Sequence, residues 1–387
     1  MISDRLAQGE MDMTHDTEER GVTELLRASS EKEKAEELLR LLQGRGSERH
    51  AVVLQDFPDP DAISCAFGYK LLAESLGIET DLLYAGRISH QENLALINLL
   101  DITLIQWQGG EIPRGQYQGA VFLDNQGTTS RMTEFLERAG VPILAVVDHH
   151  VDQERLRPQF LDLRMVGASA SIFTNYLQSG VMDLKDSRPE HRQLATALMH
   201  GIISDTGCLV HAKPFDFQAA AFLHPFVNPG LLFEILHQKR NHKVMEVIRI
   251  ALANRVMREN FCLSGIGYLR SDDRDAIPQA ADFLITEETV HTAIVYGVIT
   301  YGDGREVIQG SLRTNKQTLA PDAFLKDALG RNEEGHFYGG GKSSAGGFEI
   351  PLGFLSGHDD PTLAEVKWEA FSNKIRHKFF QKIGVES

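Results

Sequence analysis

Short apolar runs that alternate with helical segments are the feature that most constrains the fold of residues 50–215. Helices are predicted between the runs, and one extends from Ala62 to Leu76, where Gly77 stands in the usual C-terminal position. Strands that are apolar throughout and separated by helices are typical of a parallel sheet with helices on both faces. The sequence therefore predicts an α/β fold for this part. The predicted strands are His50–Gln55, Asp81–Tyr84, Ala120–Leu123 and Ile143–Val147.

A second, smaller α/β block begins near Phe261. The turn Tyr301–Gly304 is a strong hairpin signal, and a helix is predicted at Pro321–Leu329 before the glycine-rich loop Tyr338–Gly347. Four apolar residues near the C-terminus fall on one helical stripe, which indicates a helix docked on a core. The predicted strands are Leu263–Leu269, Thr292–Thr300 and Glu306–Arg313, and the stripe residues are Trp368, Phe371, Ile375 and Phe379.

The length of 387 residues suggests two to three domains, since a domain has about 150 residues. Four leucines within residues 38–42 give the charge-dense N-terminal stretch one apolar helical face, so a docked or partly frayed leader helix is expected there. Helical periodicity from Phe217 to Asn260 predicts a connecting segment. The predicted organisation is a charged helical leader at 1–49, a parallel-sheet domain at 50–215, a helical linker at 216–260, a smaller α/β domain at 261–360 and a C-terminal helix at 361–387.

The charge balance limits the partners of the chain. It has 39 Lys and Arg residues against 54 Asp and Glu residues, which gives a net charge of −15. Long nucleic acid held by charge needs a basic footprint, so a general DNA-binding protein is disfavoured and no long-DNA binding is expected. Short phosphorylated ligands are compatible with this charge.

The cysteines and the lack of a long apolar segment indicate in which cellular compartment the protein is expected. Cys65, Cys208 and Cys262 are far apart in the sequence and form neither a zinc-binding pattern nor a disulfide framework, which suits a reducing environment. No apolar stretch is long enough to span a membrane, and acidic residues occupy the N-terminus in place of a signal peptide. We expect a cytoplasmic protein without a membrane partner.

Acidic residues stand at the ends of the predicted strands and helices. In an open parallel sheet, the crevice beyond the carboxyl ends of the strands is the usual ligand site. Carboxylates gathered there repel one another unless a cation lies among them, and carboxylates with imidazoles suit Mn²⁺, Mg²⁺, Co²⁺ or Fe²⁺ better than structural Zn²⁺. Each residue alone is an ordinary turn residue, but the ordered set predicts a metal site. The set comprises Asp59, Asp61, Asp124, Asp148, His149, His150 and Asp205.

At these residues the sequence resembles the DHH phosphoesterase superfamily, in the oligoribonuclease and phosphoadenosine-phosphate phosphatase-like branch that carries a C-terminal DHHA1 domain. The resemblance extends from His50 to Leu352. It implies an N-terminal parallel-sheet DHH domain and a C-terminal α/β DHHA1 domain. The matching motifs are Pro58–Ala62, Leu123–Asn125, Val147–His150, Ile203–Gly207, Gly310–Arg313 and Gly339–Gly347.

The resemblance also implies two divalent metals, usually Mn²⁺, with Mg²⁺ or Co²⁺ as alternatives. His150 would face the phosphate or the leaving oxygen, and Asp148 would orient a histidine. By position, the first ion would be held by Asp61, Asp124, His149 and Asp205, and the second by Asp59 with the shared Asp124.

Gln55 departs from the family pattern, because a histidine usually stands at this position, four residues before Asp59. A glutamine amide oxygen can bind a hard cation, but it is a neutral donor in place of an imidazole, so the second metal site is expected to be weaker. His90 is the alternative imidazole. It is an ordinary first-turn residue if Ser89 and Glu92 form a capping box.

Lys342 is the second departure, since the glycine-rich loop of the family usually ends in histidine. A lysine keeps a phosphate-binding cation but does not exchange protons as an imidazole does. With Arg313 and the backbone N–H groups of Gly340 and Gly341, it predicts a phosphate or carboxylate clamp. Arg131 is either a further phosphate contact or a solvent-facing arginine at a helix start.

We therefore expect a metal-dependent phosphoesterase with its substrate between two α/β domains. The resemblance implies short oligoribonucleotides, dinucleotides or 3′-phosphoadenosine 5′-phosphate as substrates. Exopolyphosphatase or pyrophosphatase-like hydrolysis is the alternative among metal-dependent hydrolases. The alternative that is not primarily an enzyme is a catalytically weakened nucleotide sensor. The natural substrate, the direction of cleavage and the formation of a homodimer stay open.

Overall fold

The computed structural model describes residues 31–88, 90–342, 344–357 and 360–384. The chain forms two compact units, which divide between Gln238 and Lys239. This division lies inside the predicted linker 216–260, so the linker is not a separate segment. Leu223 and Ile235 are buried in the core of the first unit, whereas Val247 belongs to a core of the second.

The first unit contains strands β1 (Arg49–Val53), β2 (Glu79–Tyr84), β3 (Ile105–Gln106), β4 (Gly119–Leu123), β5 (Ile143–Asp148) and β6 (Phe160–Leu163). Their order across the sheet is β3-β2-β1-β4-β5-β6, and every neighbouring pair is parallel, as the apolar runs predicted. The direction of the strand order reverses between β1 and β4. Ligand sites of parallel sheets usually lie beyond the strand ends at such a reversal.

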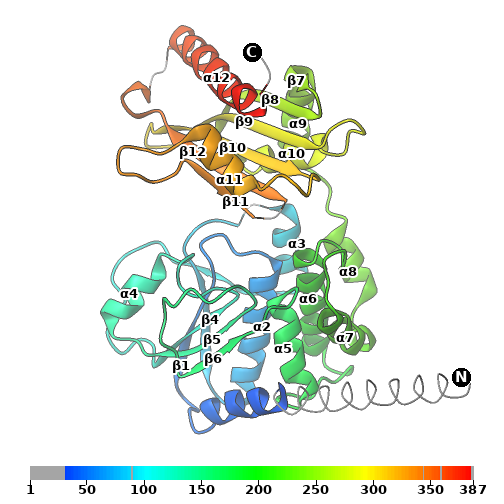
Figure 1. Ribbon diagram of the computed structural model, residues 1–387. Helices are drawn as coiled ribbons and strands as arrows, with labels where there is room; N and C mark the ends of the chain where they lie inside the picture. The colour runs from blue at the N-terminus through cyan, green and yellow to red at the C-terminus, as the bar shows by residue number, and fades with distance from the viewer. Residues whose placement is uncertain (1–30, 89, 343, 358–359, 385–387) are drawn as a thin grey trace, which may run out of the picture. The chain divides into compact units, whose positions relative to one another are not determined.

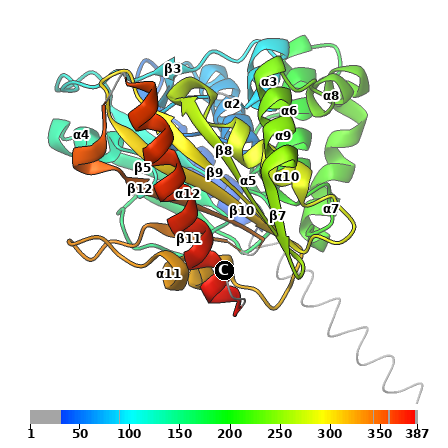
Figure 2. The same ribbon diagram turned by 90° about the horizontal axis from the view of Figure 1, so that it is seen from above.

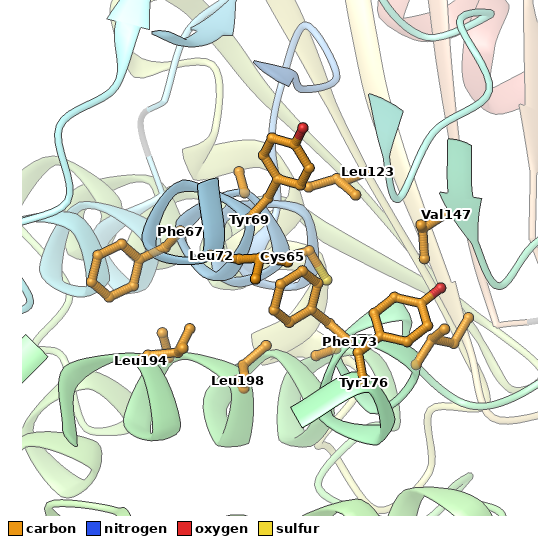
Figure 3. Close-up of a cluster of buried hydrophobic side chains, with 14 of the residues drawn as sticks. Cys65, Phe67, Tyr69, Leu72, Leu123, Val147, Phe173, Tyr176, Leu194 and Leu198 are labelled. Atoms are coloured by element: carbon orange, nitrogen blue, oxygen red, sulfur yellow. The ribbon is translucent and has the colours of Figure 1, made fainter. Parts of the chain in front are cut away.

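The helices of this unit are α2 (Pro60–Ser75), α3 (Gln91–Leu99), α4 (Met132–Ala139), α5 (Ser169–Gln178), α6 (Pro189–Asp205), α7 (Pro214–Leu223) and α8 (Pro229–Leu236), with a short 3-10 helix η1 (His224–Phe226). They cover both faces of the sheet (Figure 1). On one face, α2, α5 and α6 bury a large apolar cluster, which includes Phe67, Phe173 and Leu198 (Figure 3). On the other face, Met132 and Leu136 of α4 pack on the strands.

Residues 31–42 are helical and dock on the first unit, as the leucine pattern predicted. Leu38 and Leu42 are buried in its core. The ammonium group of Lys34 donates to the main-chain oxygen of Leu161 in β6, which ties this helix to the edge strand. The rest of the predicted leader, residues 1–30, lies outside the described residues.

The second unit contains strands β7 (Arg255–Arg258), β8 (Phe261–Arg270), β9 (Thr292–Thr300), β10 (Glu306–Thr314), β11 (Gly339–Gly341) and β12 (Ala345–Pro351). Their order is β11-β12-β10-β9-β8-β7. The pair β8 and β9 is parallel, and the other neighbours are antiparallel. The predicted turn Tyr301–Gly304 connects β9 to β10 as a hairpin.

The helices of the second unit are α9 (His242–Asn254) and α10 (Ala276–Leu284) on one face of the sheet and α11 (Pro321–Leu329) and α12 (Pro361–Ile383) on the other, with short 3-10 helices η2 (Ser271–Asp273) and η3 (Gly353–Leu355). Figure 2 shows α9 beside α10, and α12 running over the sheet. Ile375 and Phe379 are buried, and Trp368 and Phe371 pack against the same core, so the predicted C-terminal stripe is confirmed. None of the helices that the structure describes is long and apolar enough to cross a bilayer.

Two local predictions in the second unit are wrong, and strand pairing is the reason for both. The helical pattern predicted up to Asn260 ends earlier, because Arg255–Arg258 pairs antiparallel with β8. The segment Tyr338–Gly347, predicted as a loop, instead supplies β11 and the first residues of β12, which pair with each other. Hydrogen bonds to a neighbouring strand leave no mark in local periodicity, so tertiary context overrides the local preference.

Candidate metal centre

Three neighbouring strands and two helix ends supply the side chains of the candidate site. Strands β1, β4 and β5 are adjacent and parallel, so their carboxyl ends lie at one edge of the sheet. The N-terminus of α5 and the last residue of α6 reach the same side chains. The predicted residues that meet here are Gln55, Asp59, Asp61, Asp124, Asp148, His149, His150 and Asp205.

Two overlapping groups of these side chains can hold a metal ion. Within each group, one ligand atom of every residue lies within 4.8 Å of the others. Carboxylate oxygens combined with imidazole nitrogens suit divalent ions such as Mn²⁺, Mg²⁺ and Co²⁺. The first group is Asp61, His149 and Asp205, and the second is Asp124, Asp148, His149 and His150.

Asp124 is buried at the end of β4 and is held from both sides. Its φ of 57° is left-handed, a conformation that Asp tolerates better than most residues. Oδ1 accepts a hydrogen bond from the Ser169 hydroxyl at 2.9 Å, and Oδ2 accepts one from the Gln55 amide at 2.9 Å. Burial raises the pKa of Asp124 well above its usual range, and the charges of Asp59 and Asp61 raise it further.

Gln55 turns its NH₂ group toward Asp124, not its oxygen. The amide nitrogen donates to the main-chain oxygen of Asp124 at 2.8 Å as well as to Oδ2. Both of these atoms are acceptors, which assigns the amide orientation from the hydrogen-bond pattern. The predicted metal contact through the Gln55 oxygen is therefore not the contact that the structure shows.

Asp61 receives the N-terminus of α5. Its oxygens accept hydrogen bonds from the main-chain N–H groups of Ser169 and Ala170, both at 2.7 Å. The partial positive charge of a helix N-terminus favours an anion there. Burial and the neighbouring Asp205 nevertheless raise the pKa of Asp61 to about 8. A cation beside this carboxylate would offset that repulsion.

His149 provides the test of whether a metal fits these residues. Its Nδ1 lies 3.3 Å from the main-chain oxygen of Val166, which accepts the proton and leaves Nε2 to face the carboxylates. Nε2 is buried, 3.0 Å from Asp205 Oδ2 and 3.5 Å from Asp124 Oδ1, without a well-formed hydrogen bond. Burial lowers the pKa of His149, but close contact with Asp205 and the charge of Asp61 outweigh it and raise the pKa to about 9. The surrounding carboxylates therefore favour positive charge at this nitrogen, which a proton or a metal ion can supply. The donor set fits a divalent metal that takes the place of the proton.

Asp148 is occupied with hydrogen bonds inside the protein. Its Oδ1 accepts from Nδ1 of His150 at 2.8 Å and from the main-chain N–H of His149 at 2.7 Å. Its Oδ2 accepts from the Gln126 amide at 2.8 Å. Burial would raise the pKa of Asp148, but the hydrogen bonds from His150 and Gln126 hold it below its usual value. This geometry positions the His150 ring.

Asp59 begins α2. Its Oδ1 accepts from the main-chain N–H of Ala62 at 3.0 Å, in the N-cap position. After burial, the charge of Asp59 is the largest cause that raises the pKa of Asp124.

His90 is not brought to the metal-binding groups that the described residues form. It is exposed at the N-cap of α3, without a side-chain cap bond. Glu92, the predicted capping partner, lies instead 2.6 Å from Nε2 of the buried His200. Ser89 lies outside the described residues. The structure gives no support to His90 as the missing imidazole.

The residues predicted to bind phosphate have local partners. Nε of Arg131 donates to Asp56 at 2.6 Å and Nη2 to the main-chain oxygen of Ala85 at 2.8 Å, which ties two loops to the start of α4. In the second unit, Nε of Arg313 donates to Asp282 at 2.5 Å. Gly340 and Gly341 belong to β11, and Lys342 follows them in the turn to β12.

No protein-family model matches the chain. The sequence is 36% identical over 333 residues to MJ1633, an uncharacterized protein of Methanocaldococcus jannaschii, and the alignment covers 85% of this chain and 63% of that protein. The chain thus spans less than two thirds of the length of this relative.

An exopolyphosphatase-related protein from Bacteroides fragilis is similar in structure, with a TM-score of 0.63 at 13% identity over 89% of this chain and 96% of that protein. The alignment and the mixed α/β architecture agree with the resemblance in the sequence. The chain shares the fold of this exopolyphosphatase-related protein. RecJ from Thermus thermophilus, in complex with Mn²⁺, aligns with a TM-score of 0.43 at 13% identity over 91% of this chain and 55% of RecJ.

Two residues of this candidate site were not assigned by the sequence analysis. Ser169 donates to Asp124 from the first residue of α5, and Gln126 holds Asp148. The small residues that precede α5 are the signal that could have pointed to Ser169. The carboxylate of Asp216 accepts from the main-chain N–H of Gly167 at 3.0 Å, and a Cβ at Gly167 would lie 2.3 Å from the same carboxylate. Glycine is therefore required where the chain turns toward Ser169.

Proposed function

We propose that the chain is a metal-dependent phosphoester hydrolase. The observation that carries this proposal is the buried carboxylate cluster beyond β1, β4 and β5. Asp61 and Asp124 are 0% and 2% exposed, and the imidazole of His149, 3.5 Å from Asp124, is a neighbouring group that can carry positive charge. Buried carboxylates are costly unless a cation compensates them. A divalent ion would compensate several of them at once.

Asp61, Asp124, His149 and Asp205 would hold this ion. When bound, it would lower the pKa of a water molecule and offset charge on the phosphoryl oxygens. His150 would donate a proton or a hydrogen bond from Nε2 to the leaving oxygen or to the phosphate. Asp148 and Gln126 would keep the His150 ring in place through the hydrogen bonds described above.

The substrate class that we propose is a short oligoribonucleotide, a dinucleotide or 3′-phosphoadenosine 5′-phosphate. The resemblance to the DHH and DHHA1 motifs supports this class, and the net charge of −15 disfavours a long polyanion. Arg313, Lys342 and the N–H group of Gly340 would contact phosphate or carboxylate oxygens of the ligand. The N–H group of Gly341 donates to Asp322 at 3.3 Å and would have to leave it to do the same. Arg131 would add a contact with its remaining N–H donors.

Two other functions have a specific observation in their favour. Exopolyphosphatase or pyrophosphatase-like hydrolysis is favoured by the structural similarity to the exopolyphosphatase-related protein. A nucleotide sensor with weakened catalysis is favoured by Gln55, which places an N–H donor beside Asp124. Both functions would use the same cluster of residues.

Hydrolysis by the full-length chain distinguishes these functions. The substrates are 5′-pApA, 3′-phosphoadenosine 5′-phosphate, pyrophosphate and polyphosphate, each with Mn²⁺, Mg²⁺ or Co²⁺. We expect Mn²⁺-dependent turnover of a nucleotide substrate, abolished by Asp205→Asn and retained by Asp186→Asn, which removes a surface carboxylate. Turnover of polyphosphate alone would favour the exopolyphosphatase. If the chain binds nucleotide but hydrolyses none of the substrates with any of the three metals, the result would contradict an enzymatic function and favour the sensor.

A further inference from the structure

We propose that this centre holds a single divalent cation and that Gln55 sets this number. This inference rests on the metal-binding site of the proposed function and adds how many ions the site takes. The observation behind it is the pair of hydrogen bonds from Gln55 to Asp124.

The two oxygens of Asp124 face different surroundings. Oδ1 lies 3.5 Å from Nε2 of His149, so it faces the group that can hold the first ion. Oδ2 lies 2.9 Å from the Gln55 amide nitrogen, which points an N–H at it. A second ion that Asp124 bridged with both of its oxygens would need Oδ2, and the N–H group carries partial positive charge where that ion would have to approach. Gln55 therefore disfavours a second ion electrostatically.

Rotation of the Gln55 amide does not remove this obstacle. If the oxygen replaced the nitrogen, it would face the main-chain oxygen and Oδ2 of Asp124, which are both acceptors. Two favourable hydrogen bonds would become two repulsive contacts. The main-chain oxygen of Asp124 remains a hydrogen-bond acceptor when a metal binds, so the NH₂ group of Gln55 continues to point toward it.

The neighbouring side chains offer few donors for a second ion. Asp148 accepts four hydrogen bonds, three at Oδ1 from His149 N–H, His150 N–H and His150 Nδ1 and one at Oδ2 from Gln126. Its oxygens are therefore committed to positioning His150. Asp59 also caps α2 through Oδ1.

His149 is the member common to both candidate groups, and it can serve one ion only. Its Nδ1 is directed at the main-chain oxygen of Val166, so Nε2 is its single ligand atom for this site. Asp61 and Asp205 form the first candidate group with His149. This group brings two carboxylates and the imidazole within reach of one ion. The donors thus converge on one ion, because His150, the imidazole that belongs to the second group alone, has its Nδ1 bound to Asp148 at 2.8 Å.

Mn²⁺ titration of the metal-free full-length chain tests the number of ions. Calorimetry and metal analysis after dialysis give the stoichiometry, and electron paramagnetic resonance separates an isolated Mn²⁺ from a coupled pair. We expect one Mn²⁺ per chain with the hyperfine pattern of an isolated ion. Two Mn²⁺ per chain with a coupled spectrum would overturn the proposal.

Gln55→His and Gln55→Glu test the role of Gln55, since each replaces the N–H donor by a metal ligand. We expect both variants to bind two Mn²⁺ ions with a coupled spectrum. Gln55→Glu preserves the shape of the side chain, so it also covers the case in which the histidine does not fit. Gln108→His, at an exposed glutamine, is the control for a histidine that binds Mn²⁺ on its own. Folded variants that still bind one ion would refute the role of Gln55.

The same samples separate this inference from the proposed function. Two coupled ions in the wild type together with turnover would refute only the single-ion centre. One ion without turnover of any substrate would refute only the hydrolase. A wild-type chain that binds no Mn²⁺ would refute both.

Discussion

The amide nitrogen of Gln55 donates to Asp124 twice, at 2.8 Å to the main-chain oxygen and at 2.9 Å to Oδ2. Asp124 adopts a φ of 57°, which is unusual for a residue with a side chain and is common at functional sites. The first bond supports this backbone conformation, and the second fixes the carboxylate. One side chain, Gln55, thus holds both the backbone at the end of β4 and the position of the Asp124 carboxylate in the site.

Asp124→Asn should lower the affinity for Mn²⁺ by at least about 100-fold, the upper end of the effect of residues around a metal site. Asparagine has the shape of aspartate and tolerates the left-handed φ, so the fold should be retained. Calorimetry measures the affinity, and circular dichroism checks the fold. An unchanged affinity in a folded variant would show that Asp124 is not a ligand.

Ser169→Ala should weaken Mn²⁺ binding by about 10-fold, because the hydroxyl orients Oδ1 of Asp124. Ser171→Ala is the matched control: Ser171 is also buried in α5, and its hydroxyl has no hydrogen-bond partner among the described residues. Calorimetric titration of both variants gives the comparison. Equal effects of the two substitutions would mean that a general loss of packing, and not the orientation of Asp124, is responsible.

Lys342→Gln should raise the KM for the hydrolysed nucleotide by about 10-fold, the effect of one hydrogen bond to a charged group. The kcat should change by less than about twofold if Lys342 only anchors the ligand. Steady-state kinetics separates the two constants. Lys316→Gln, at another exposed lysine, is the control. A fall in kcat at constant KM would contradict an anchoring role.

Gly310→Ala should destabilise the second unit by about 1–3 kcal/mol, the cost of overpacking a core. A Cβ at Gly310 would lie 2.1 Å from Cζ of Phe348, its register partner on β12. Gly347→Ala is the control, since its Cβ would have its closest neighbour at 3.7 Å. Urea unfolding gives the free energies. Similar values for both variants would show that the Phe348 ring moves aside without cost.

Stability should fall as the pH decreases through the range in which His50 titrates. His50 is fully buried, with Nδ1 2.8 Å from the Tyr69 hydroxyl and Nε2 3.0 Å from Glu48. Burial lowers its pKa in the folded state, although Glu48 opposes this. The unfolded chain then binds the proton first, so stability is present above the unfolded pKa of about 6.5 and is lost below it.

Denaturant unfolding at about pH 7.5 and about pH 5.5 measures this dependence. The difference between the two free energies should be smaller in His50→Asn than in the wild type. His336→Asn, which removes an exposed histidine, is the matched control. A wild-type difference that persists unchanged in His50→Asn would assign the acid sensitivity to other groups.

Much of the fold was predictable from the sequence, because its strands and helices have strong local patterns. The apolar runs of β1, β2, β4 and β5 and the helix Pro321–Leu329 coincide with the structure to within a few residues. Strands β3, β6 and β7 and the hairpin of β11 and β12 were missed. These segments are short or rich in glycine and charge, and pairing with a neighbouring strand defines them.

The sequence by itself determined which acidic residues and histidines stand at strand and helix ends, since motif order and spacing are local properties. The tertiary structure decided how they are used. Ser169 reaches Asp61 across 108 positions of the sequence, and Gln55 reaches Asp124 across 69. Hydrogen bonds over such separations produce no periodicity, and the direction of an amide group depends on acceptors that only the folded chain brings together. The donor role of Gln55 could therefore be seen only in the structure.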